Sequence, residues 1–269
     1  MNPGPPQSLR VASCMAQNAD AMCRDLTAYL ARQLDMPASF VDDVPWQERE
    51  RLLDAGAIDL CWICGLPYVQ KADRAGSIEL CVAPVMKATR YGGLPVYFSD
   101  VVVRSDGALA CFADLQGATW AYNEPRSHSG FNLVCYHLAQ LGYTLGYFGR
   151  LVEAGSHQAA LRLILSGEVA AAAIDSTVLE AELAQRPGLA AEIRRIAVFG
   201  PSPAPPWVLS SRLPARLRDR IRRCLTDMSA DAAGQRILES WQISELRPVE
   251  DAAYDPIRKM ARSAEAAVA

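Results

Sequence analysis

The sequence predicts an α/β protein that folds as two lobes joined by a two-strand hinge, and two observations lead to this prediction. Strand and helix signals alternate through most of the 269 residues, as they do in parallel α/β architectures. Two long apolar segments, Val96 to Arg104 and Ile193 to Val208, bracket a self-contained α/β block of roughly 100 residues, which is a common domain size. If both segments cross between the lobes, residues 1–98 with 205–269 form lobe 1 and residues 99–204 form lobe 2.

The strands expected in lobe 1 are short apolar runs between turn residues. These runs are Leu9 to Ser13, Phe40 to Val44, Ala57 to Ile63, Leu80 to Met86 and Trp207 to Leu209. Helical spacing of apolar side chains predicts one helix after the first strand and another over Glu48 to Ala55. Beyond Leu209 the chain reads as purely helical, with Pro214 in the first turn of one helix and with Asp231 and Asp255 as caps of two more.

The middle block continues the alternation of strands and helices. Its expected strands are Val96 to Arg104, Thr119 to Tyr122, Val169 to Ile174 and Ile193 to Phe199. Its expected helices run from near Ser129 to Gly142, from His157 to Leu165, and from the N-cap Ser176 to Leu183. Polar residues that follow the carboxyl ends of parallel strands gather at one edge of the sheet, so ligands are expected there.

The composition disfavours several classes of partner. The net charge is −3 and no long basic run is present, whereas binding to a phosphate backbone usually leaves a basic footprint. No run approaches the ~20 apolar residues that a membrane span needs. The first residues lack the basic start and the apolar run of a secretory signal. This pattern predicts a cytoplasmic location, or a periplasmic one if an export segment has been trimmed.

The chain has eight cysteines, most of them in apolar segments, and we expect reduced, buried thiols. They are Cys14, Cys23, Cys61, Cys64, Cys81, Cys111, Cys135 and Cys224. Cys61 and Cys64 form a Cys-x-x-Cys motif, which reads as the end of a strand. A redox motif of this type opens a helix, and a zinc site of this type needs a second Cys pair. No metal and no cofactor are therefore expected.

The most informative segment is Ser127-His128-Ser129-Gly130, where a polar loop leads from a strand into a helix. Free amides at a helix N-terminus, two hydroxyls and an imidazole together form an anion site. Gly130 lets the backbone approach a ligand closely. The alternative is that Ser127 or Ser129 only caps the helix.

His157 and Asp175 are expected at the same edge of the sheet. His157 follows Gly155 and Ser156 at the start of a helix, where it could donate to an oxyanion or be a capping or surface histidine. Asp175 ends a strand that reads as buried, and its alternative role is also that of a helix cap. Tyr97, on a crossing strand, would bring a hydroxyl to the cleft.

Three aromatic residues of lobe 1 are candidates for the walls of a ligand pocket. They are Trp46, Trp62 and Tyr68. The alternative is a position in the hydrophobic core, which is the more common location of such side chains.

The chain resembles the phosphonate-binding proteins of ABC transporters, within the class of type 2 periplasmic binding proteins. The resemblance covers nearly the whole chain, from Leu9 to Ala261. The matching stretches are Asp59 to Trp62, Val96 to Ser99, Val101 to Arg104, Asp114 to Gly117, Ser127 to Gly130, Gly155 to His157, Gly167 to Asp175 and the Pro-rich segment before Trp207. Their order and spacing together are specific.

This resemblance implies two α/β lobes and a hinge that closes over the ligand. The Ser-Thr-Ser-Gly-like loop of the family binds phosphonate oxygens, which implies this role for residues 127–130, with His128 in place of the usual Thr. It also implies that His157 contacts the same oxygens and that Tyr97 brings an aromatic hydroxyl to the pocket. Asp175 lies near the position where acidic residues of the family meet the amino group of an aminophosphonate.

Three functions remain open at this point. The first, which the resemblance favours, is a monomeric solute-binding component of an ABC transporter that clamps a phosphonate-like or phosphate-like anion between its lobes and delivers it to a permease. The second is a cytoplasmic enzyme of the same fold that acts on a small carboxylate or phosphorylated ligand, with His128, His157 and Asp175 as acid, base and orienting group. The third is a cytoplasmic sensor that docks to a kinase or a regulator.

Overall fold

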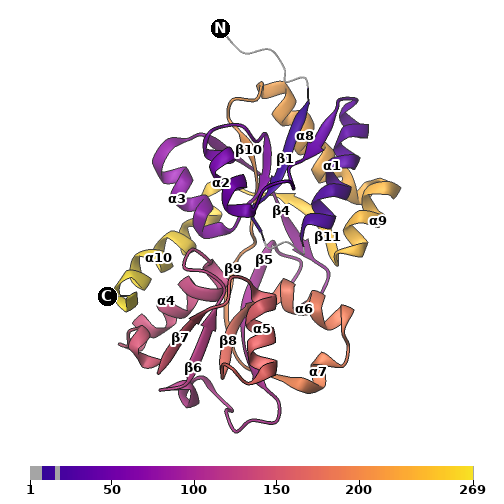
Figure 1. The fold of residues 1–269 in the computed structure, drawn as a ribbon. Coiled ribbons are helices and arrows are strands. Elements are labelled where there is room, and N and C mark those ends of the chain that lie inside the picture. The colour runs from indigo at the N-terminus through magenta and orange to yellow at the C-terminus, as the bar shows by residue number, and fades with distance from the viewer. Residues whose placement is uncertain (1–7, 16–18, 269) are drawn as a thin grey trace. The chain divides into compact units, whose positions relative to one another are not determined.

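The computed structural model describes residues 8–15 and 19–268 and confirms the α/β fold in two lobes (Figure 1). Each lobe contains its own mixed β-sheet with helices on both faces. The lobes are called unit 1 and unit 2 below, and each is described by itself.

The chain passes between the units at three points. Unit 1 extends to Val96 and resumes over Pro203–Tyr254. Unit 2 contains Tyr97–Ser202 and the chain from Asp255 onward. Two crossings, at residues 98 and 204, were expected from the sequence, and the third was not.

Unit 1 is built on a sheet with the strand order β11-β4-β10-β3-β1-β2. Its strands are β1 (Leu9–Ser13), β2 (Ala38–Phe40), β3 (Leu60–Trp62), β4 (Ile78–Met86), β10 (Trp207–Ser210) and β11 (Ile243–Pro248). β1 runs parallel to β2 and β3, whereas β10 runs antiparallel to β3 and β4. Leu9, Val11 and Leu60 are fully buried, because helices cover both faces of the sheet.

The helices of unit 1 are α1 (Asp20–Leu34), α2 (Trp46–Asp54), α3 (Gly65–Ala75), α8 (Ala215–Thr226) and α9 (Ala232–Ser240). In α1, Met22, Leu26 and Leu30 are buried because they recur at helical spacing on one face. α1 packs against α8 and α9. Figure 1 shows these three helices on one side of the sheet and α2 and α3 on the other.

Three parts of unit 1 differ from what the sequence predicts. The strand expected over Phe40 to Val44 shares only Phe40 with β2, which begins earlier, at Ala38. The interpretation of the chain beyond Leu209 as purely helical is wrong, because β11 follows α9 and pairs antiparallel with β4. Helix α3 occupies a segment in which no helix was expected. Pro67 lies in the first turn of α3, where a missing amide costs no intrahelical hydrogen bond.

Unit 2 is built on a sheet with the strand order β7-β6-β8-β5-β9. Its strands are β5 (Val96–Arg104), β6 (Thr119–Tyr122), β7 (Arg150–Glu153), β8 (Ala171–Asp175) and β9 (Ile193–Pro203). β6 runs parallel to β7 and β8, and β5 runs antiparallel to β8. This register places Ser99 of β5 directly opposite Asp175 at the end of β8.

Alternate residues of the unit 2 strands face two hydrophobic clusters. Val101 and Val103 point into a cluster with α4 (Leu133–Gln140) and α10 (Asp255–Val268). Val102 points into a second cluster, with α5 (His157–Ser166) and α6 (Ser176–Gln185). The alternation follows from the two-residue period of a strand and means that both faces are covered, as Figure 1 shows.

Short helical segments complete the two units. They are α7 (Leu189–Glu192), the 3-10 turns Thr89–Tyr91, Phe112–Leu115, Leu145–Tyr147, Asp227–Ala230 and Asp251–Tyr254, and a π-helical turn over His128–Asn132. The π-helical turn leads directly into α4 and carries the segment that the sequence analysis singled out.

Helix α10 belongs to unit 2, whereas the sequence analysis assigned residues 255–269 to lobe 1. Ala264 and Ala267 are buried in the cluster that also contains Val134 and Leu138 of α4. Because small alanine side chains let the two helices approach closely, α10 covers α4 and completes this face of unit 2.

Candidate functional site

The candidate site lies in unit 2, where β6 ends and the chain enters the π-helical turn before α4. Residues Ser127–Gly130 form this entrance and are called the serine loop. Ser127 is the N-cap, and its Oγ accepts a hydrogen bond from the Gly130 amide at 3.1 Å. The carbonyl of Ser127 accepts from the Asn132 amide at 2.9 Å. The Ser127 hydroxyl proton therefore stays available as a donor.

The serine loop is buried and supported from the sheet. Ser127 and Ser129 are each 3% exposed. The Ser99 hydroxyl on β5 donates to the Ser129 carbonyl at 2.8 Å, which fixes the loop against the strand. Single π-helical turns occur often at functional sites.

His157 joins the serine loop from the start of α5. Its Nε2 lies 3.1 Å from the Ser129 Oγ. Ser156 caps α5 by accepting from the Ala159 amide at 3.1 Å, so the imidazole is held at a capped helix end. Burial lowers the pKa of His157 to about 4, despite the opposing effect of the Ala173 backbone. The imidazole is therefore neutral at neutral pH, and its Nε2 forms one hydrogen bond with the Ser129 hydroxyl.

Gly130 is where these segments meet most closely. A Cβ atom on Gly130 would lie 2.0 Å from Asn123 Oδ1 and 3.1 Å from His157 Cε1. No side chain fits at these distances without movement of a neighbour. Gly130 thus allows the loop after β6, the serine loop and the start of α5 to touch, and its close approach to a ligand stays a prediction.

His128 is turned into the interior of unit 2. Its Nδ1 lies 3.0 Å from Asn132 Nδ2 and its Nε2 lies 3.1 Å from Ser202 Oγ. Because Asn132 Nδ2 is an NH2 group that can only donate, His128 Nδ1 is the acceptor and Nε2 carries the proton that Ser202 accepts. Burial lowers the pKa of His128 to about 3. Both ring nitrogens are thus used inside the protein, and contact of His128 with a ligand stays a prediction.

Asp175 and Tyr97 flank the serine loop. Asp175 caps α6, and its Oδ1 accepts from the Thr177 amide at 2.8 Å and from the Thr177 hydroxyl at 2.7 Å. Burial raises the pKa of Asp175 to about 6. Tyr97 is 1% exposed, and its ring centroid lies 6.4 Å from that of His128. One carboxylate oxygen of Asp175 therefore caps α6, as the alternative interpretation expected. A contact of Asp175 with a ligand stays a prediction.

The three aromatic candidates lie in unit 1. Trp62 stacks on Trp207 at 5.7 Å between ring centroids, and its Nε1 donates to the Pro205 carbonyl. Tyr68 is buried, and its hydroxyl donates to Asp251 Oδ1. Tyr68 is therefore a core residue, whereas Trp62 is half-buried beside Trp207. Trp46 opens α2 with a half-buried ring. A role of these rings at a ligand stays a prediction.

Three residues that shape the site were not expected from the sequence. Asn132 and Ser202 bind His128, and Asn123 lies against Gly130. The spacing of four residues between His128 and Asn132 in a helical segment was a usable signal, because such residues face each other. Ser202 and Asn123 carried no signal, since their contacts come from other parts of the chain.

Two general features bear on the kind of site. Among the described residues, no group of three or more His, Cys, Asp and Glu side chains is arranged to hold a metal ion. Over the same part of the chain, we find no helix with the length and apolar character that a membrane crossing requires.

The fold and the site define a class, the two-lobed solute-binding proteins. The family model for the periplasmic substrate-binding protein of phosphonate ABC transporters matches residues 13–254. The chain therefore belongs to the family of phosphonate ABC transporter substrate-binding proteins, and its function as the substrate-binding component of such a transporter is confirmed. This family is a transporter component, so it gives the enzyme alternative no support.

Solved structures agree with this fold. One is the binding protein component of an ABC phosphonate transporter from Pseudomonas aeruginosa, with a TM-score of 0.84 and 18% identity over 96% of this chain and 86% of that chain. Another is PhnD1 from Prochlorococcus marinus in complex with methylphosphonate, with a TM-score of 0.84 and 18% identity over 97% of this chain and 99% of that chain. A Xanthomonas citri protein bound to ATP has a TM-score of 0.76 at 14% identity over 97% of this chain and 98% of that chain.

Proposed function

We propose that this chain binds a phosphonate and that the serine loop and His157 hold its anionic head. The observation that carries the proposal is that the buried Ser129 hydroxyl meets the buried His157 imidazole, beside the Ser127 N-cap, where two helical segments begin. Membership of the phosphonate-binding family supports this ligand class. So does the methylphosphonate bound by the similar Prochlorococcus marinus protein.

The chemistry of the serine loop suits an oxyanion. The amides of His128 and Ser129 precede the first backbone hydrogen bond of the helix, which runs from Asn132 to Ser127. Such amides have no intrahelical acceptor and carry the positive end of the helix dipole. The Ser127 hydroxyl adds a donor, because its oxygen already accepts from Gly130. A tetrahedral anion with three oxygens matches this group of amides and hydroxyls.

His157 gives the site a response to ligand charge. The imidazole is neutral in the free protein because burial lowers its pKa to about 4. A bound phosphonate would place negative charge beside Nε2 and raise the pKa of His157, since an opposite charge favours the protonated ring. The neutral free site avoids the cost of a buried, unpaired cation.

The family also carries the proposal for location and partner. Its members are periplasmic substrate-binding components. We therefore propose that this chain works in the periplasm as a monomer and delivers its ligand to an ABC transporter permease. A cytoplasmic location would contradict this part of the proposal, and fractionation of the native host with an antibody against the chain tests it.

The experiment that tests the ligand is calorimetric titration of the purified protein with methylphosphonate, aminoethylphosphonate, phosphate, methanesulfonate and acetate. We expect binding of the phosphonates and a loss of affinity of about tenfold or more in a Ser127→Ala, Ser129→Ala double variant, because two charge-assisted hydrogen bonds are lost. Thr144→Ala is the matched control, since Thr144 also caps a helical turn of unit 2, by accepting from Gly146, outside the serine loop. Silence of the wild-type protein toward every phosphorus oxyanion, or unchanged affinity of the double variant, would contradict the proposal.

A further inference from the structure

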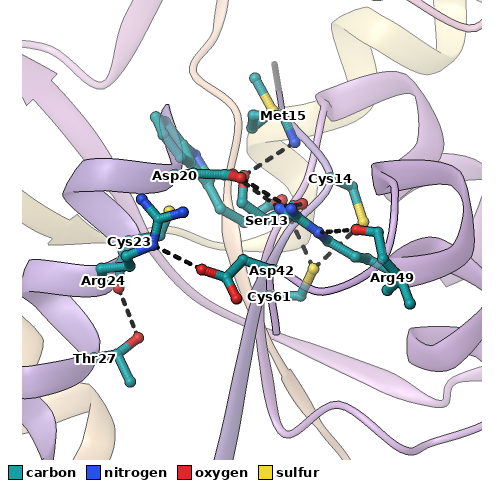
Figure 2. Close-up of polar contacts among 12 residues, drawn as sticks. Ser13, Cys14, Met15, Asp20, Cys23, Arg24, Thr27, Asp42, Arg49 and Cys61 are labelled. Carbon is teal, nitrogen blue, oxygen red and sulfur yellow. Dashed lines mark hydrogen bonds and ion pairs between the residues drawn. The ribbon is translucent and has the colours of Figure 1, made fainter. Parts of the chain in front are cut away.

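A pair of thiols in unit 1 takes no part in the candidate site described for unit 2. Cys14 Sγ and Cys61 Sγ are 3.6 Å apart, although the two residues are separated by 47 positions in the chain (Figure 2). β1 and β3 are parallel neighbours, and Ala12 is paired with Cys61. Cys14 lies two residues after Ala12, so its side chain returns to the same face of the sheet as that of Cys61. The strand pairing therefore brings the two sulfurs together.

The surroundings hold the two sulfurs differently. Cys61 is fully buried, in a strand that pairs with β1 on one side and with β10 on the other. Cys14 is partly exposed and lies one residue beyond the end of β1, where its amide donates to the Trp62 carbonyl at 2.9 Å. Cys14 is thus the sulfur that a reagent in solution reaches, and Cys61 is the fixed neighbour.

We propose that Cys14 and Cys61 form a reversible disulfide that fastens the carboxyl ends of β1 and β3 to each other. The oxidant is a disulfide, carried either by a small molecule such as oxidised glutathione or by a thiol oxidoreductase. The inference is independent of the ligand proposed above, because it concerns thiols of unit 1 and a different reaction.

The reaction balances in two steps. The Cys14 thiolate attacks one sulfur of the oxidant, which forms a mixed disulfide and releases the first thiolate. Cys61 then gives up its proton and attacks Cys14 Sγ, which forms the internal disulfide and releases the second thiolate. Two protein thiols lose two hydrogens, and one oxidant disulfide becomes two thiols. Burial raises the pKa of the Cys61 thiol, so Cys61 acts as the second, resolving sulfur.

Bond formation requires a local movement. The sulfurs must approach from 3.6 Å to the bond length of about 2.05 Å. Cys14 lies diagonal to Cys61 rather than opposite it, so the end of β1 must shift toward β3. This shift falls on Cys14, because the ladders on both sides of β3 hold Cys61 in place.

The test is disulfide mapping of the wild-type protein. The full chain is incubated with oxidised glutathione or with dithiothreitol, its free thiols are alkylated under denaturing conditions, and the digest is analysed without reduction. After oxidation we expect one cross-link, between the peptides of Cys14 and Cys61, and alkylation of the other six of the eight cysteines. The oxidised protein should melt roughly 10 °C higher than the reduced one, because the cross-link closes a long loop of the unfolded chain.

Two variants make the mapping decisive. Cys14→Ala should lose both the cross-link and the redox dependence of the melting temperature. Cys111→Ala removes an exposed thiol of unit 2 and should keep both. Alkylation of all eight thiols after oxidation, or a cross-link of Cys61 to Cys64 instead, would overturn the proposal, and neither result depends on the folding of a variant.

Discussion

Replacement of Gly130 by alanine should weaken phosphonate binding by about tenfold or more, while the protein still folds. The new Cβ atom would lie 2.0 Å from Asn123 Oδ1, whereas an ordinary contact starts near 3.4 Å, so the amide of Asn123 must move by the difference, about 1.4 Å. His157 Cε1, at 3.1 Å, must also give way by a few tenths of an ångström. His157 belongs to the proposed anion site, and Asn123 packs against its loop at Gly130.

The effect on stability is small because two contributions oppose each other. Crowding of a packed site costs about 1–3 kcal/mol. Alanine in a helical segment regains about 1 kcal/mol relative to glycine. We therefore expect a loss of at most ~2 kcal/mol in the free energy of unfolding. The affinity for methylphosphonate should fall by about tenfold or more, because the donors around the head group are displaced.

The assays are calorimetric titration with methylphosphonate and urea unfolding. Gly188→Ala is the matched control, since a Cβ there meets nothing within 4 Å. A double variant with Asn123→Ala removes the closest clash and should recover part of the lost affinity. Wild-type affinity in Gly130→Ala, or no recovery in the double variant, would refute the reasoning about this contact.

Two further predictions concern stability. On folding, the pKa of histidine falls from its ordinary value of 6.5 to about 3 in His128 and about 4 in His157. Below pH 6.5 the unfolded chain therefore binds more protons than the folded one, so the stability present above that pH is lost on acidification. Asp175 acts in the opposite sense, because its pKa rises from 3.8 to about 6, and the net loss from these three groups is roughly 1 kcal/mol per pH unit between pH 6 and 4. Burial also lowers the pKa of His137, which adds to the loss in the same sense. Urea unfolding at pH 7 and pH 5 measures this, and equal stability at both would contradict it. Asp20→Ala should lower the free energy of unfolding by about 3–5 kcal/mol. The reason is that the buried guanidinium of Arg49, which donates to the Asp20 carboxylate at 2.8 Å and 2.9 Å (Figure 2), would lose its counter-charge. A loss below 1 kcal/mol in urea unfolding would show that the pair contributes little.

Local patterns predicted most strands and helices, because hydrophobic period and turn residues are properties of neighbouring positions. β11 was missed, since only Ile243 and Leu246 of its six residues are buried and it lies between helices. The placement of α10 in unit 2 depends on Ala264 and Ala267 meeting α4, a contact that no local pattern encodes.

The candidate site was predictable to the extent that topology determines it. Ser127, Ser129 and His157 follow strands β6 and β7 of one parallel ladder, and they meet at its edge. The orientation of His128 was not predictable, because Ser202, 74 residues away, accepts its proton. Cys61 was considered with its sequence neighbour Cys64, whereas β1–β3 pairing gives it Cys14 as its partner.

Because the chain crosses between the units three times, each unit needs segments that are synthesised late before its core is complete. On a ribosome, unit 1 lacks β10 and β11 until the chain has passed Pro248, and the α4 face of unit 2 stays uncovered until α10 emerges. Neither core can close while most of the protein is being made, in contrast to proteins whose N-terminal domain folds first during translation. A product that stops before α10 would expose the apolar side chains around Val134 and Leu138, a surface that favours aggregation.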